Sequence, residues 1–304
     1  DFAVTHLQAL IDAGMTVDAV LTRPDKPAGR GQKLQASPVK TLALSLGLPV
    51  HQPTTLKNQE AISFITRFNA DVIIDVAYGV IIPKEILKIP RLGFVNVHPS
   101  LLPRWRGPAP IQHVLLAGDE DTGVTIMKLD EGVGTGPIYL QKTYHIQPNE
   151  TSAILHDRLA KLGSKALITV LQKLQAGSIE EVPQTNVGVC YAPKIEKPMA
   201  EIHWSHSAIE IERGIRAFID WPVAFSFIGG ETVKIWDANP LSNYVSEKPG
   251  TILRLDKLGI DVATGNGILR IQKMQFPGGK VLPVVDILNS KKTFIEQHMK
   301  FEFH

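Results

Sequence analysis

The sequence has little of what marks secreted, membrane-spanning or metal-binding proteins. Only one of its 304 residues is a cysteine, Cys190, which excludes an internal disulfide framework and a cysteine-rich zinc module. The most apolar run, 72–82, contains Asp75 and Gly79 and is shorter than the roughly 18 apolar residues that a membrane span needs. No basic region followed by an apolar core stands at the start, so we expect no secretory signal and a cytoplasmic location.

A strong excess of charge is also missing. Lys and Arg number 32 against 30 Asp and Glu, so net charge alone does not indicate a nucleic-acid-binding protein. A hydrophobic fraction of 44% supplies enough apolar surface for a sizeable core, and the length favours two domains.

Helix-like and strand-like segments alternate over the first 190 residues, which predicts an α/β domain with a doubly wound, mostly parallel sheet. The expected helices are 2–11, 37–47, 56–68, 109–117 and 151–176. The expected strands are 16–22, 71–78, 93–98, 122–129 and, as an edge or antiparallel strand, 137–146. Because such a sheet ordinarily begins with a strand, we expect a first strand to be missing from this sequence.

The pattern changes after about residue 190. A short helix over 207–217 is followed by strand-like runs, and Asn266-Gly267 is a strong hairpin signal between two of them. This predicts a small β-rich domain, a barrel of the oligonucleotide-binding kind. We therefore divide the chain into a catalytic domain (1–192), a linker (193–203) and a C-terminal domain (204–304).

The most informative stretch is 96–103, Asn-Val-His-Pro-Ser-Leu-Leu-Pro. Asn96 and His98 lie two residues apart at the end of a predicted strand, so their side chains share one face. An imidazole can relay a proton near neutral pH, and a carboxamide can donate to an oxygen that gains negative charge. Together they suit attack of an amine on a carbonyl; the alternative is that they only cap the strand.

The run NVHPSLLPRWRGPAPIQ resembles the signature of the 10-formyltetrahydrofolate-dependent formyltransferases. Further segments resemble the methionyl-tRNA branch of that family in the same order: LTRPDKPAGRG with SPVK, VAYGVIIPK, GVTIMKLDEG and the later IHWSHSAIEIERGIRAF. The resemblance implies transfer of a formyl group from N10 of the folate to the α-amine of methionyl initiator tRNA. It implies that Asn96 and His98 are catalytic and that the folate lies against Ser100, Leu101, Leu102 and Pro103.

One position departs from the family pattern. Gly134 stands where the family has an aspartate that orients the catalytic histidine, and glycine offers no charge. Either Asp130 or Glu131 reaches the site instead, or the enzyme is weakened; our hypothesis is that it is weakened. The glycines at 132, 134 and 136 do not form a dinucleotide-binding motif, because they lie between two strands.

Residues 21–42 carry a charge of +4, which suits a loop that grips phosphates. The resemblance implies that this loop contacts the tRNA acceptor stem through Arg30, with Lys33 beside it. The C-terminal domain holds 12 basic against 11 acidic residues, so any tRNA contact there needs cations gathered on one face. Its candidate lysines are Lys273, Lys280, Lys291 and Lys292.

Several alternatives stay open. The acceptor amine could belong to an amino-sugar nucleotide or a purine precursor, the chain could be a silent tRNA-binding relative, or it could hydrolyse the formyl-folate. His203 and His206 have no further ligand at recognisable spacing, so we expect no metal. Nothing in the sequence requires more than a monomer.

Overall fold

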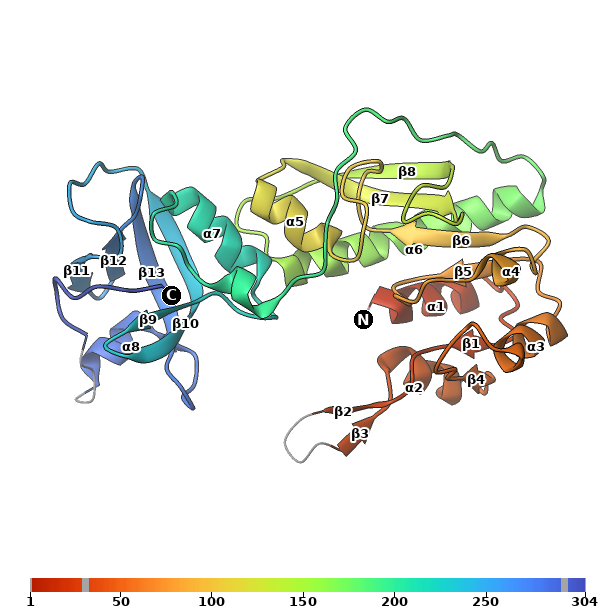
Figure 1. The fold of residues 1–304 in the computed structure, drawn as a ribbon, viewed down its shortest axis with the longest axis horizontal. Coiled ribbons are helices and arrows are strands. Elements are labelled where there is room, and N and C mark those ends of the chain that lie inside the picture. The colour runs from red at the N-terminus through yellow and green to blue at the C-terminus, as the bar shows by residue number, and fades with distance from the viewer. Residues whose placement is uncertain (1, 29–32, 291–294, 304) are drawn as a thin grey trace. The chain divides into compact units, whose positions relative to one another are not determined.

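The computed structural model describes residues 2–28, 33–290 and 295–303. Its contacts divide the chain into two compact units (Figure 1). The first comprises 1–110, 120–146 and 156–193, and the second comprises 111–119, 147–155 and 194–304. No helix among the described residues is long and apolar enough to cross a membrane.

The first unit contains helices and short strands in alternation. Its elements are α1 (Phe2–Asp12), β1 (Val20–Leu21), β2 (Lys26–Ala28), β3 (Lys33–Gln35), α2 (Pro38–Ser45), β4 (Val50–His51), α3 (Gln59–Arg67), β5 (Ile73–Asp75), α4 (Lys84–Leu87), β6 (Phe94–His98), β7 (Asp121–Lys128) and β8 (Ile138–His145). Most of α6 (Ser152–Gln175) belongs here, whereas its first turn and most of α5 (Pro110–Ala117) belong to the second unit.

The sheet is mixed, which corrects the prediction of a mostly parallel one. β5 and β6 pair in parallel, but β6–β7 and β7–β8 are antiparallel, and β1–β4 form a separate parallel pair. The antiparallel β7–β8 pair follows from its connection, a loop with no helical crossover, whereas β6 and β7 are antiparallel although α5 lies between them. The expected strand 16–22 is reduced to Val20–Leu21.

A local signal placed the start of α2 correctly, whereas α3 begins at Gln59, after the predicted start at 56. Ser37 caps α2 by accepting a hydrogen bond from the Lys40 backbone N–H at 3.3 Å, and Pro38 occupies the first helical position. Asn58 caps α3 in the same way, with 3.0 Å between its Oδ1 and the Ala61 nitrogen.

One face of β6 is covered by α6. Gly163 on α6 lies so close to the sheet that a Cβ there would meet Val97 Cγ1 at 3.0 Å and His6 Nε2 of α1 at 2.9 Å. Because side chains alternate along a strand, Asn96 and His98 point to the face opposite Val97. The close approach of α6 thus fixes which face of β6 is left for a site.

The second unit contains a six-stranded sheet with the order β11-β12-β13-β10-β9, and β14 pairs with β13. Its elements are a 3-10 helix (Lys197–Ala200), α7 (Ala208–Ala217), β9 (Phe225–Ile228), β10 (Glu231–Leu241), β11 (Ile252–Asp256), β12 (Gly259–Ala263), β13 (Ile268–Gln275), β14 (Leu282–Pro283) and α8 (Val284–Asn289). The Asn266-Gly267 turn joins β12 and β13 as predicted, with Gly267 at φ +85°.

The strand pairing does not close this sheet into a barrel, since β11 and β9 stand at opposite ends of the strand order. Backbone hydrogen bonds of the chain's last residues nevertheless reach both edges. Ile252 at the β11 edge donates to Met299, and Phe227 at the β9 edge exchanges hydrogen bonds with Glu302. The predicted oligonucleotide-binding barrel therefore stays a prediction.

We expect Ile235→Ala to lower the free energy of unfolding by about 3 kcal/mol, because Ile235 on β10 is fully buried in the core of the second unit. The measurement is denaturant unfolding followed by tryptophan fluorescence. Leu258→Ala, at a side chain 52% exposed, is the matched control and should change stability by less than about 0.5 kcal/mol. Equal losses for both variants would contradict the assignment of this core.

Candidate active site

Asn96 and His98 lie at the carboxyl end of β6, on the same face, as predicted. The strand is flanked by β5, where Asp75 is the register partner of Asn96, and by β7, where Thr125 is the partner of His98. Polar side chains from three adjacent strands therefore meet at this point of the sheet.

His98 has a half-buried ring with one defined partner. Its Nε2 lies 2.9 Å from the backbone carbonyl oxygen of Trp105. Because a carbonyl only accepts, Nε2 carries the proton in the neutral ring and Nδ1 is the proton acceptor. Burial lowers the pKa of His98, and the hydrogen bond to Trp105 opposes this only in part. His98 is therefore a neutral base near pH 7.

The carboxamide of Asn96 is held by Asp75. Its Nδ2 donates to Asp75 Oδ2 at 2.7 Å and to the Asp75 backbone oxygen at 3.2 Å. Burial raises the pKa of Asp75, and the hydrogen bonds from Asn96 and from the Tyr78 backbone oppose that rise. Sequence reasoning missed Asp75, and the available signal was its position as a charged residue at the end of an apolar strand.

The loop after β6 is held rigidly. Thr125 Oγ1 donates to the Ser100 carbonyl at 2.7 Å and accepts from the Leu102 N–H at 3.1 Å, and Gln141 Nε2 donates to the Leu102 carbonyl at 2.8 Å. The Ser100 hydroxyl donates to the Arg104 carbonyl at 2.7 Å. Ser100 and Leu102 are buried, whereas Leu101 and Pro103 are half-buried. The predicted folate-contacting residues thus form a preorganised loop beside His98.

Residues 190–192 form hydrogen bonds with the turn at 105–106, which in turn bonds to His98. Trp105 has a φ of +64°, and its N–H donates to Cys190 Sγ at 3.3 Å. The Arg106 N–H donates to the Cys190 carbonyl at 3.0 Å, and the Arg106 carbonyl accepts from the Ala192 N–H at 2.7 Å. Cys190 therefore helps to set the direction of the Trp105 carbonyl. The Trp105 ring stacks on Arg104, whose guanidinium carbon lies 4.4 Å from the ring centroid.

The loop around Gly134 is fixed by Gln184. Gln184 Nε2 donates to the carbonyls of Gly134 and Gly136 at 2.8 Å each, and its Oε1 accepts from Arg106 Nη2 at 2.8 Å. Gly134 has a φ of +65°, and a Cβ there would meet Arg106 Cγ at 3.4 Å. Sequence reasoning found the glycine but missed Arg106 and Gln184.

The two carboxylates considered as substitutes at this loop have other partners. Asp130 Oδ1 accepts from the Gly132 N–H at 3.0 Å and from Thr135 Oγ1 at 2.7 Å, which folds the loop on itself. Glu131 forms an exposed ion pair with Lys84 at 2.5 Å. Neither side chain is brought to His98.

The predicted nucleic-acid contacts are described only in part. Arg30, Lys291 and Lys292 lie outside the described residues, and Lys33 begins β3. Lys280 is exposed, whereas Lys273 forms an ion pair with Asp237 at 3.6 Å. Among the described residues, no group of three or more His, Cys, Asp or Glu side chains could hold a metal ion.

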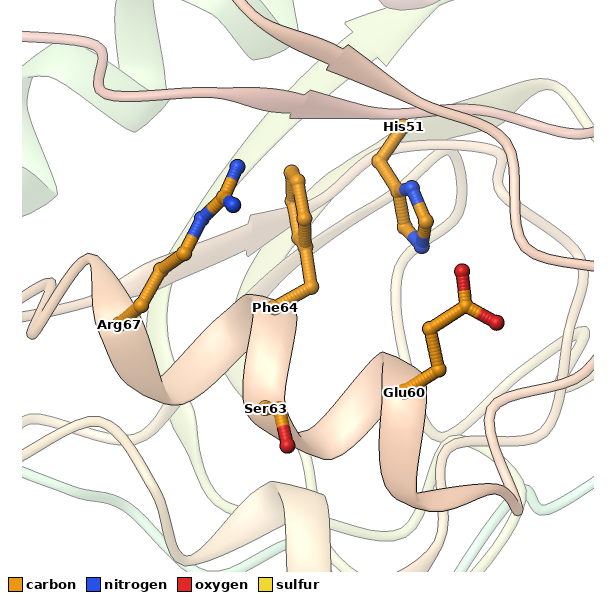
Figure 2. A pocket seen from close by; sticks show the side chains of 5 residues that line it. All are labelled: His51, Glu60, Ser63, Phe64 and Arg67. Carbon is orange, nitrogen blue, oxygen red and sulfur yellow. The ribbon is translucent and has the colours of Figure 1, made fainter.

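A surface hollow of about 440 Å³ lies elsewhere in the first unit (Figure 2). Its lining residues are His51, Glu60, Ser63, Phe64 and Arg67. Phe64 stacks on His51 with 4.1 Å between the ring centroids, and the Arg67 guanidinium lies 4.4 Å from the Phe64 centroid. This hollow shares no residue with the Asn96–His98 pair, so it does not define the candidate active site.

Solved structures with this fold include several formyltransferases. WlaRD, a sugar 3N-formyl transferase solved in the presence of dTDP and 5-N-formyl-THF, has 22% identity and a TM-score of 0.67 over 92% of this chain and 96% of its own. An N-formyltransferase from Helicobacter canadensis, in complex with folinic acid and dTDP-3-aminofucose, has 19% identity and a TM-score of 0.65 over 89% and 95%.

HypX from Aquifex aeolicus, in complex with tetrahydrofolic acid, is a longer relative. It has 19% identity and a TM-score of 0.60, and the match covers 84% of this chain but only 44% of HypX. At these identities the likenesses show the fold. Family models give the assignment: residues 1–171 match the formyl transferase model and 194–292 match its C-terminal domain. The chain therefore belongs to the formyl transferase family.

Proposed function

We propose that this chain transfers a formyl group from 10-formyltetrahydrofolate to the α-amino group of methionyl initiator tRNA. The observation that carries the proposal is the Asn96–His98 pair at the end of β6, with a neutral His98 whose Nε2–H bonds to the Trp105 carbonyl. A base and a carboxamide side by side suit amine attack on a carbonyl, and the family assignment supplies formyl transfer as the reaction class.

The folate supplies a formyl carbon carried on N10. The acceptor amine forms a new bond to that carbon, the bond to N10 breaks, one proton leaves the amine and one proton reaches N10. His98 Nδ1 can accept the first proton and return it to N10, so the side chain ends unchanged. The loop 100–103 lines the donor site in this proposal, because its hydrogen bonds to Thr125 and Gln141 fix it beside His98.

The acceptor is assigned from the basic segment 21–42. Two of its cations are used within the fold, since Lys40 pairs with Asp25 at 2.7 Å and Arg23 bonds to the Tyr78 carbonyl at 2.9 Å. Arg30 and Lys33 are our candidates for phosphate contacts on the tRNA. In this proposal residues 1–192 carry catalysis, 193–203 are a linker, and 204–304 form a barrel-like tRNA-binding domain.

An amino-sugar nucleotide is the second candidate acceptor. It is favoured by the two sugar N-formyltransferases described above, each of which matches at least 89% of this chain. The deciding experiment offers the chain both acceptors with 10-formyltetrahydrofolate. Transfer to charged initiator tRNA supports the proposal, and transfer only to the sugar nucleotide replaces it. Formate released without any acceptor would indicate hydrolysis, and tRNA bound without turnover would indicate a silent relative.

We expect Arg30→Ala and Lys33→Ala each to lower kcat/KM for charged initiator tRNA by about tenfold, because each removes one phosphate contact. The slope of log Kd against log salt should also fall by about one per substitution. Lys57→Ala, an exposed lysine outside the basic segment, is the control and should leave both values unchanged. Wild-type binding and salt dependence in both variants would contradict this placement of the tRNA.

A further inference from the structure

Asp75 is a carboxylate in direct contact with the proposed catalytic pair. It ends β5, and β5 pairs in parallel with β6 so that Asp75 and Asn96 lie side by side. Both its carboxylate and its backbone carbonyl accept from Asn96 Nδ2, at 2.7 Å and 3.2 Å. Asp130 and Glu131 have other partners, as described above, so Asp75 supplies a carboxylate to a site where residue 134 offers none.

These two contacts also determine which end of the Asn96 carboxamide faces away from Asp75. A backbone carbonyl only accepts, so the nitrogen must be the atom that faces it. Both hydrogens of Nδ2 are then directed at Asp75, and Oδ1 is the end that Asp75 does not hold. In this arrangement Asn96 presents an acceptor to the site, whereas the role expected from the sequence required a donor.

We propose that Asp75 is a positioning residue that holds Asn96 by its nitrogen, so that Asn96 Oδ1 accepts a hydrogen bond from the attacking amine. This inference rests on the proposed function. One amine N–H bonds to Oδ1, the nitrogen lone pair is directed at the formyl carbon, and His98 Nδ1 takes the proton that is released. A negative carboxylate on Nδ2 also increases the electron density on Oδ1, which strengthens the acceptor.

The environment of Asp75 indicates that its negative charge does not stabilise the fold, so a functional role can be distinguished from a structural one. The titratable group that interacts with it is Tyr78, whose own pKa is raised by burial, and Arg23 bonds to the Tyr78 carbonyl. Burial raises the pKa of Asp75. A raised pKa in the folded state means that ionised Asp75 is unfavourable for folding once the pH exceeds the unfolded value. The fold would therefore be at least as stable with a neutral residue there.

The test is Asp75→Asn, which keeps the size of the side chain and removes its charge. We expect kcat to fall by about 10- to 100-fold, because the loss of the negative charge weakens both the hydrogen bond that holds Asn96 Nδ2 and the acceptor strength of Asn96 Oδ1. The KM for the formyl donor should change by less than twofold, and Tm should be unchanged or higher. In the wild type, protonation of Asp75 should lower the transfer rate as the pH falls, and this loss should be absent from the variant. Asp71→Asn, at an exposed aspartate paired with Arg91, is the control and should behave as wild type.

Each result decides the matter. An unchanged kcat in Asp75→Asn would overturn the inference, and parallel losses of kcat and Tm would assign Asp75 a structural role. If the wild type transfers formyl to no amine, the proposed function fails separately. The inference is then judged by nuclear magnetic resonance of the Asn96 side-chain amide, assigned by its loss in Asn96→Asp. Its resonances should titrate with Asp75 in the wild type, and their failure to do so would overturn it.

Discussion

His98→Ala is expected to lower formyl transfer to charged initiator tRNA by about 10²- to 10⁴-fold, because it removes the only proton carrier in our proposal. The measurement is single-turnover transfer from 10-formyltetrahydrofolate, with thermal unfolding to confirm that the variant folds. His145→Ala is the matched control, since this exposed histidine pairs with Asp121 on β7, and its activity should equal that of the wild type. Substantial transfer by His98→Ala would remove the histidine from the mechanism.

The same histidine determines the expected pH dependence. Burial lowers the pKa of His98, so its neutral form persists below pH 6.5 and protonation becomes effective only at lower pH. Transfer should therefore be lost as the pH falls through this lowered value, together with the separate contribution of Asp75. In Asp75→Asn, which removes the separate contribution of Asp75, an acid limb of transfer at or above pH 6.5 would contradict the assignment of His98 as the base.

Gly134→Asp is expected to raise turnover by about tenfold or more. The backbone at 134 is in the left-handed region, which aspartate tolerates better than most residues, and its Cβ would make ordinary contact with Arg106. The new carboxylate would lie next to the turn whose Trp105 carbonyl bonds to His98. A carboxylate that orients a catalytic histidine contributes several orders of magnitude in other enzymes.

Gly134→Asn separates charge from shape in this experiment. Asparagine tolerates the same backbone conformation and has the same size, but it carries no charge, so we expect no gain in turnover. Equal gains in both variants would assign the effect to the loop conformation. No gain in Gly134→Asp would show that the enzyme works fully with glycine at 134, and our hypothesis of a weakened enzyme would be wrong.

The local elements were predictable because their signals are local. The helix starts at 37 and 207 and the turn at Asn266-Gly267 depend on residues within four positions, and the structure confirms all three. The strands β9 and β14 and helix α8 were missed, because their pairing and burial come from distant partners rather than from periodicity. The antiparallel strand β8 was expected, but the antiparallel pairing of β6 with β7 was missed for the same reason, since strand direction is decided by pairing.

The sequence alone determined that the chain forms an α/β domain followed by a β-rich one, and that Asn96 and His98 share a strand face. It also located the family signature around them. The tertiary structure decided what surrounds that pair. Asp75 reaches Asn96 across 21 positions, and Gln184 reaches Arg106 across 78. Such contacts depend on strand register and on the packing of distant loops, and no local sequence pattern encodes either of these. They determine which atoms of the site are held by hydrogen bonds and which are left to react.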